Sequence, residues 1–182
     1  MTNQNTRKVV TMAMLTALVI VLQVVATFVN FGGFPITLTL VPIIIAGAVY
    51  GPGAGAFMGL VFGIVVAVMV VIGADPSGAT LFSIHPVITV SACLLKGVLA
   101  GFISALIYHG LKDKNQTLAI ILAAAATPIV NTGTLYLALI FFFQATFAAM
   151  LAAFMSVNFL IELLINVLIA PSLLRIVRKR IK

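Results

Sequence analysis

The chain has 182 residues, of which 63% are hydrophobic and only 7% are charged, and its formal net charge is +7. A soluble domain needs many more charged residues to cover its surface, so this composition excludes an ordinary soluble protein and indicates an integral membrane protein. The ten Lys and Arg residues lie at the chain ends, in one short loop and at a single intramembrane position. They form no basic stripe, which excludes a nucleic-acid-binding protein.

The first half of the chain contains three apolar segments, the longer of which reach the roughly 20 residues that cross the hydrocarbon of a bilayer. The first helix is expected over residues 9–29 and ends where two glycines and a proline follow. The second, over residues 37–50, is short, and Pro42 near its start predicts a bent or partly re-entrant segment. The third begins after Gly51-Pro52-Gly53 and reaches residue 72, where a polar connection over residues 73–84 follows.

The second half contains three further apolar segments. The fourth helix is expected over residues 86–109, before the only charged loop, and the fifth over residues 118–143. The sixth is expected to end near Pro171, before a basic tail. Small residues at every fourth position in the third and fourth helices predict close packing against neighbouring helices. We therefore predict an all-α bundle of six transmembrane helices in a single domain, residues 1–182.

Positive charge predicts the orientation of this bundle, because Lys and Arg in short flanking segments stay on the cytoplasmic side. With six spans and a cytoplasmic amino terminus, nine of the ten Lys and Arg residues fall in the cytoplasm. The loops after the first, third and fifth helices then carry none. Both termini are therefore expected in the cytoplasm.

Two ionisable residues lie deep within the predicted spans, where charge is costly unless it is paired or faces a cavity. Lys96 lies about 16 Å along the fourth helix by the helical rise, too deep for easy contact with water. Glu162 shares one face of the sixth helix with Asn158 and Asn166. Either Lys96 and Glu162 pair and hold two helices together, or they contact a solute of complementary charge.

Further polar and aromatic residues complete a predicted solute site. Pro128 and Gly133 flank Asn131 in the fifth helix and loosen it, which can free backbone groups for a ligand. Aromatic rings can supply flat surfaces around a solute, and a histidine stands at the outer end of the fourth helix. The predicted substrate-binding residues are Asn131, Lys96, Glu162, Asn158, Tyr136, Thr132, Gly133, His85 and Phe82.

An enzyme is not expected. His85 and His109 lie at opposite ends of the fourth helix, and no His-Glu-x-x-His spacing is present. The single cysteine, Cys93, has no second cysteine with which to form a disulfide or a thiolate metal site, so we expect neither a metal nor a bound cofactor.

Three segments together resemble the substrate-binding S component of energy-coupling factor (ECF) vitamin transporters, and the resemblance spans nearly the whole chain. These segments are Ala13-Met14-Leu15-Thr16-Ala17, Tyr50-Gly51-Pro52-Gly53-Ala54-Gly55-Ala56 and Lys96-Gly97-Val98-Leu99-Ala100-Gly101. A fourth, Ala126-Thr127-Pro128-Ile129-Val130-Asn131-Thr132-Gly133, looks like the signature of the pantothenate-type members.

The resemblance implies a mechanism and partners. Such a component resides in the bacterial cytoplasmic membrane, binds a B vitamin from outside, topples within the bilayer and releases the vitamin inside. Ala13 and Ala17 would contact a transmembrane T subunit, and residues 30–36 and 73–84 would cover the vitamin. Two cytoplasmic ATPase subunits would use the ATP, which agrees with the lack of a Gly-x-x-x-x-Gly-Lys-[Ser/Thr] loop in this chain.

Three alternatives remain open from the sequence. The chain is an S component for another vitamin or precursor, a proton-coupled secondary carrier in which Glu162 titrates, or a structural membrane subunit. Lack of clear internal symmetry disfavours the carrier, because most such carriers are built from two repeats. A structural subunit would have no solute pocket facing outward.

Overall fold

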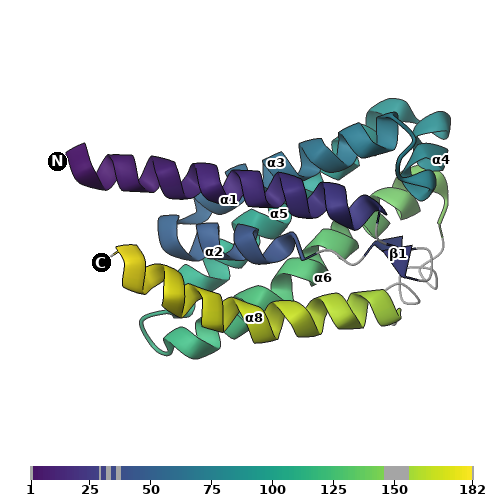
Figure 1. Ribbon diagram of the computed structural model, residues 1–182. Helices are drawn as coiled ribbons and strands as arrows, with labels where there is room; N and C mark the ends of the chain where they lie inside the picture. The colour runs from purple at the N-terminus through teal and green to yellow at the C-terminus, as the bar shows by residue number, and fades with distance from the viewer. Residues whose placement is uncertain (1, 29, 32–33, 36–37, 146–155, 182) are drawn as a thin grey trace.

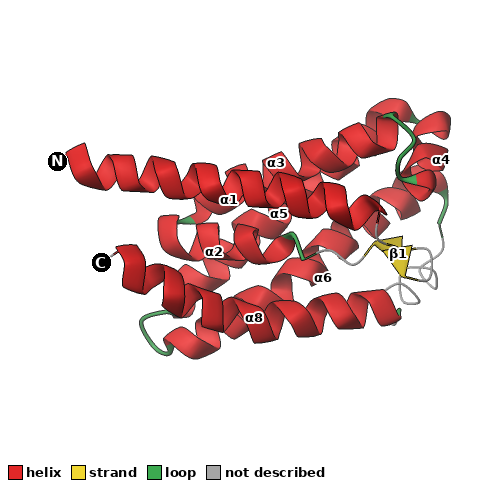
Figure 2. Cartoon of the chain, viewed as in Figure 1, coloured by secondary structure: helices red, strands yellow, loops and turns green. Residues whose placement is uncertain are grey.

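The computed structural model describes residues 2–28, 30–31, 34–35, 38–145 and 156–181. These residues form seven helices and two very short strands (Figure 2). In chain order the elements are α1 (Thr2–Phe28), β1 (Asn30–Phe31), β2 (Phe34–Pro35), α2 (Leu40–Tyr50), α3 (Pro52–Val71), α4 (Pro76–Ile84), α5 (Pro86–Leu111), α6 (Gln116–Phe143) and α8 (Val157–Ile181).

Five of the described helices, α1, α3, α5, α6 and α8, are long and apolar enough to cross a membrane. The all-helical membrane fold expected from the sequence is therefore confirmed. The remaining expected span corresponds to α2, whose 11 residues extend only about 16 Å at the helical rise. That length is about half of the hydrocarbon thickness, so the count of six full spans stays a prediction.

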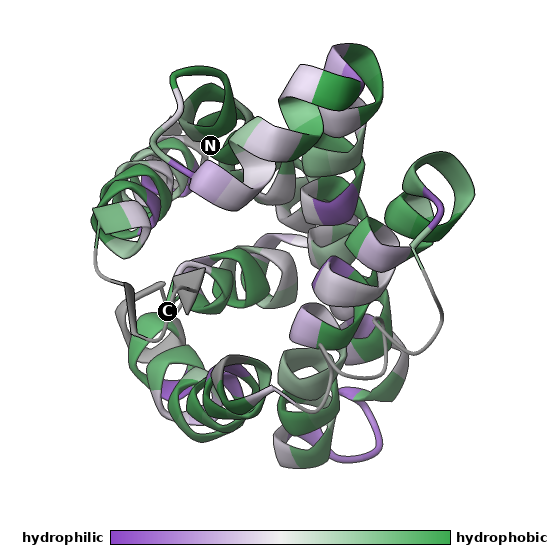
Figure 3. Ribbon diagram, turned by 90° about the vertical axis from the view of Figure 1, so that its right-hand side faces the viewer, coloured by the Kyte–Doolittle hydropathy of each residue, from purple (hydrophilic) through white to green (hydrophobic). Residues whose placement is uncertain are grey.

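The long helices run side by side along a common direction, and both chain ends lie at the same end of the bundle (Figure 1). The opposite end carries α4 and the antiparallel β1–β2 pair, in which Asn30 pairs with Pro35. Viewed from that end, hydrophobic residues make up much of the long helices (Figure 3), and many of their large hydrophobic side chains are exposed. An apolar exterior is what contact with lipid requires.

The short helix α2 forms the centre of the bundle. Every residue from Leu40 to Ala48 is buried, and α2 packs against α1, α3, α5, α6 and α8. Pro42, from which a bent or partly re-entrant segment was expected, lies in the first turn of α2, and that form of the segment stays a prediction. An N–H group there has no partner within the helix, so proline removes no hydrogen bond.

Glycines bring α3 and α5 into closer contact than any side chain would allow. Gly55 lies against the Gly101 backbone, Gly59 against Gly97, and Gly63 against the Cys93 carbonyl. The close packing expected from the small-residue spacing is thus confirmed, and α3 and α5 are each other's principal neighbours.

Three expected boundaries were wrong. Helix α1 begins at Thr2 rather than near Val9. Helix α8 does not end near Pro171 but continues to Ile181, because transmembrane helices tolerate a proline when neighbouring groups satisfy the freed carbonyl. The connection expected over residues 73–84 contains a helix, α4, which begins at Pro76 after Asp75 as its N-cap residue. Proline in the first turn and aspartate at the N-cap are both typical of a helix start.

Candidate binding cavity in the membrane bundle

A cavity of about 560 Å³ opens within the bundle near α4. This volume lies in the range of small-molecule sites. Helices α1, α3, α4, α5 and α6 all contribute to its wall. The lining residues are Gln23, Thr27, Val66, Met69, Val70, Ala74, Asp75, Pro76, Ser77, Gly78, Leu81, Thr89, Ala92, Cys93, Lys96, Leu135, Tyr136, Ala138, Leu139 and Phe143.

Lys96 is the cationic residue of this wall. It lies on α5, ten residues beyond Pro86 and therefore about 15 Å along the helix. Its ammonium stands 5.8 Å from the centroid of the Phe62 ring. Within the described part of the chain, Lys96 has no ion pair within 4.0 Å, and whether it interacts with Glu162 or with a solute stays a prediction. A cation–π contact compensates a buried ammonium only in part, which leaves Lys96 able to attract an anion in the cavity.

Gln23 and its neighbours form a polar patch that the sequence analysis missed. Gln23 lies on α1 and is 4% exposed. Its side-chain oxygen accepts a hydrogen bond from the Thr39 hydroxyl at 3.1 Å, and its backbone carbonyl accepts one from the Thr27 hydroxyl at 2.9 Å. An amide side chain within an apolar span was the signal that could have identified this residue.

The outer wall of the cavity comes from the start of α4. The Asp75 carboxylate accepts a hydrogen bond from the Gly78 backbone N–H at 3.2 Å and so caps the helix. Asp75, Pro76, Ser77 and Gly78 all line the cavity. The segment that the family resemblance assigned to covering the solute therefore does border the cavity, as a capped helix rather than a loop.

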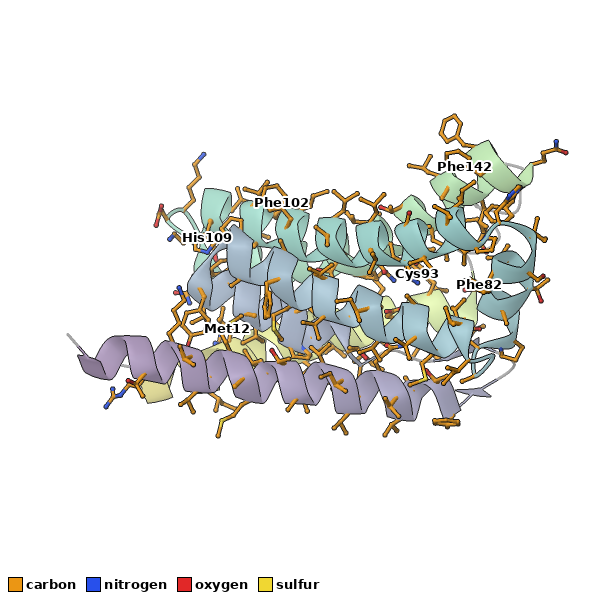
Figure 4. All side chains as sticks on the ribbon, turned by 90° about the horizontal axis from the view of Figure 1, so that it is seen from above. Met12, Phe82, Cys93, Phe102, His109 and Phe142 are labelled. Carbon is orange, nitrogen blue, oxygen red and sulfur yellow. The ribbon has the colours of Figure 1, made fainter. Side chains whose placement is uncertain are left out.

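The predicted aromatic residues are placed differently from one another. Tyr136 on α6 lines the cavity, as does Phe143 at the end of the same helix. His85 is exposed and makes an edge-on contact with Phe143, at 5.4 Å between ring centroids. Phe82 on α4 packs against the hydrophobic core and does not line the cavity (Figure 4).

Asn131, Thr132, Gly133 and Glu162 are predicted residues that lie outside the cavity wall. Asn131, Thr132 and Gly133 on α6 are partly buried, and the Asn131 side-chain oxygen is buried without a hydrogen-bond partner among the described residues. On α8, the fully buried Asn166 donates from its side-chain nitrogen to the Glu162 backbone carbonyl at 2.8 Å. The side chain of Asn158 lies outside the described residues.

The predicted partner-binding residues, Ala13 and Ala17, are both exposed on α1. Their exposed neighbours include Met14 and Leu18, which are 69% and 45% exposed. Small side chains at this spacing leave a shallow surface that another helix can approach closely.

The sequence family agrees with this arrangement. The profile described as "ECF transporter, substrate-specific component" matches residues 7–174, which is almost the whole chain. The chain belongs to this family. One similar protein is the pantothenic acid transporter PanT of Lactococcus lactis subsp. cremoris (strain MG1363), which is 29% identical over 174 residues. The alignment covers 89% of each of the two chains.

Membership settles the general class of the protein. It is a substrate-specific component of an ECF transporter and not an enzyme. It is a multi-pass protein of the cytoplasmic membrane, in accord with its apolar helices. The resemblance on which the sequence analysis relied is thereby confirmed.

Proposed function

We propose that this chain is a pantothenate-binding component that captures the vitamin from outside in the cavity near α4. The observation that best supports this proposal is the position of Lys96, which lines a cavity of about 560 Å³ within the membrane bundle. Among the described residues, its ammonium forms no ion pair with a carboxylate. Pantothenate carries one carboxylate, which would compensate this charge. The similarity to a pantothenic acid transporter supports the same substrate.

In this proposal the chain spans the membrane six times, with both termini in the cytoplasm. The two chain ends lie at the same end of the bundle (Figure 1), and six spans would put nine of the ten Lys and Arg residues on the same side of the membrane. The cavity and α4 then face outward. Fusing a reporter that fluoresces only in the cytoplasm to either terminus should give signal in both cases, and loss of signal at one terminus would contradict the orientation.

The proposed transporter also contains a T subunit and two ATPase subunits. Ala13 and Ala17 are proposed to contact the T subunit, since both are exposed on the small-residue face of α1. ATP is used by the ATPases, and this chain binds no cofactor of its own. Toppling within the bilayer then carries the bound vitamin inward.

Binding of radiolabelled pantothenate to the purified full-length protein tests the substrate. Wild type should bind, and Lys96→Met should weaken binding about 10- to 100-fold, the loss associated with one charge-assisted hydrogen bond. Lys114→Met is the matched control, because Lys114 is an exposed loop residue remote from the cavity. Equal affinity in wild type and Lys96→Met would contradict the proposed role of Lys96.

The other predicted binding residues are tested in the same assay. Asn131→Ala measures the contribution to binding of a residue of α6 that does not line the cavity. Tyr136→Leu measures the contribution of a residue of the same helix that does. Other B vitamins serve as competitors. Displacement of pantothenate by a different vitamin at lower concentration would assign the site to that vitamin and contradict the pantothenate assignment.

A further inference from the structure

Gln23 is a buried polar residue to which the proposed function gives no role. It lies on α1, is 4% exposed, and yet forms part of the cavity wall. Polar side chains at membrane depth are costly unless they are paired or face a cavity, so they mark binding sites more often than packing positions.

The hydrogen bond from Thr39 occupies the oxygen of the Gln23 amide and leaves the nitrogen as the end that can bind a ligand. Thr39 is fully buried, and its hydroxyl donates to the Gln23 side-chain oxygen at 3.1 Å. The amide nitrogen lies on the other branch of the same planar group, in a side chain that lines the cavity. An amide nitrogen in a cavity wall within the membrane can donate a hydrogen bond to an oxygen of a bound solute.

We propose that the Gln23 amide nitrogen is a second ligand-binding group, which donates a hydrogen bond to an uncharged oxygen of the solute while Lys96 binds its carboxylate. This inference rests on the proposed function. The two residues lie on different helices, α1 and α5, and both line the one cavity. A carboxylate binds the ammonium more strongly than a neutral amide, which leaves Gln23 for the amide carbonyl or a hydroxyl of pantothenate.

Because the two residues would bind different parts of the solute, each should contribute separately to ligand selectivity. Lys96 discriminates by charge, whereas Gln23 discriminates by hydrogen bonding to the neutral part of the solute. Pantothenol, in which a primary alcohol replaces the carboxylate of pantothenate, keeps the neutral part and loses the charge. Its binding should therefore depend on Gln23 and be insensitive to Lys96.

The test measures Kd for pantothenate and for pantothenol with the purified full-length protein and two variants. Gln23→Met, which preserves the length of the side chain, should weaken both ligands by the same factor of about three to ten, the effect of one neutral hydrogen bond. Lys96→Met should weaken pantothenate alone. Unchanged Kd values for both ligands in Gln23→Met overturn the proposal.

A purely structural role for Gln23 would give a different pattern. If Gln23 only ties α1 to Thr39, then Gln23→Met and Thr39→Val should lower the Tm equally and leave both Kd values unchanged. If Gln23→Met does not fold, Thr39→Val keeps the test open. This variant keeps the Gln23 amide but removes the hydroxyl that orients it, so both ligands should bind more weakly. An unchanged Kd for both ligands overturns the proposal.

An incorrect substrate assignment would be detected separately, with the wild-type protein. If wild type binds another B vitamin and neither pantothenate nor pantothenol, the substrate assignment is wrong. The Gln23 variant is then measured with the vitamin that does bind, and weaker binding supports the role of Gln23 while equal binding overturns it.

Discussion

Gly59 of α3 and Gly97 of α5 lie against each other's backbone, so that a side chain on either one would collide with the carbonyl of the other. Gly55 and Gly101 repeat this reciprocal contact one turn away. Lipid tails are as apolar as the helices, so close van der Waals packing of this kind is a main source of association between helices in a bilayer. The wall of the cavity that carries Cys93 and Lys96 is held by this contact.

Gly59→Ala should therefore destabilise the folded protein by about 1–3 kcal/mol, because the added methyl group must push α3 and α5 apart. Replacing glycine by alanine within a helix would by itself stabilise the protein. A loss of stability would therefore come from the contact between α3 and α5. Thermal unfolding of the purified protein measures it. Gly53→Ala is the matched control on α3, where nothing lies within 4 Å of the added atom, and equal Tm values for the two variants would refute the prediction.

Cys93 offers a direct report on occupancy of the cavity, because it is the single cysteine of the chain and lines the cavity wall. It lies inside the bundle, between the end that carries Phe82 and the end that carries His109 (Figure 4). Pantothenate should slow its reaction with N-ethylmaleimide, whereas a vitamin that does not bind should have no effect. Asn115→Cys in a Cys93→Ser background is the control, since labelling of that exposed loop residue should not respond to pantothenate.

Asp75 should hold the start of α4 against the cavity. Asp75→Ala removes the acceptor for the Gly78 N–H and should cost about 1 kcal/mol of local stability. Hydrogen exchange of residues 76–84 should then become faster, and pantothenate should dissociate faster. Asp75→Asn keeps an oxygen acceptor at the N-cap and should behave like wild type; if it frays α4 as much as alanine does, the capping account is wrong.

Ala17→Trp should separate binding from transport. A bulky side chain on the exposed small-residue face should block close approach of the T subunit, while the cavity near α4 is unaffected. Uptake of pantothenate by cells that express the whole transporter should fall, with unchanged binding to the purified chain. Leu18→Trp, about 100° further round the helix, is the control, and equal loss of uptake in both variants would contradict a specific contact at Ala17.

The sequence by itself determined the membrane class, the positions of the long helices and the family. These follow from local properties, namely apolar length, breaking glycines and prolines, and motifs read along the chain. It also singled out Lys96, which lines the cavity, because a lysine 15 Å into an apolar helix is costly wherever its neighbours lie. The error at Pro171 has a similar local origin, since a rule derived from soluble helices was applied within a membrane.

Only the tertiary structure decided which polar residues share a cavity. Asn131 and Glu162 carry the same sequence signal as Lys96, yet the cavity wall contains Lys96 and not the other two. Gln23 enters that wall through a hydrogen bond to Thr39, 16 residues away. Helical periodicity fixes the face on which a side chain lies, but which neighbour that face meets depends on packing between helices distant in the chain.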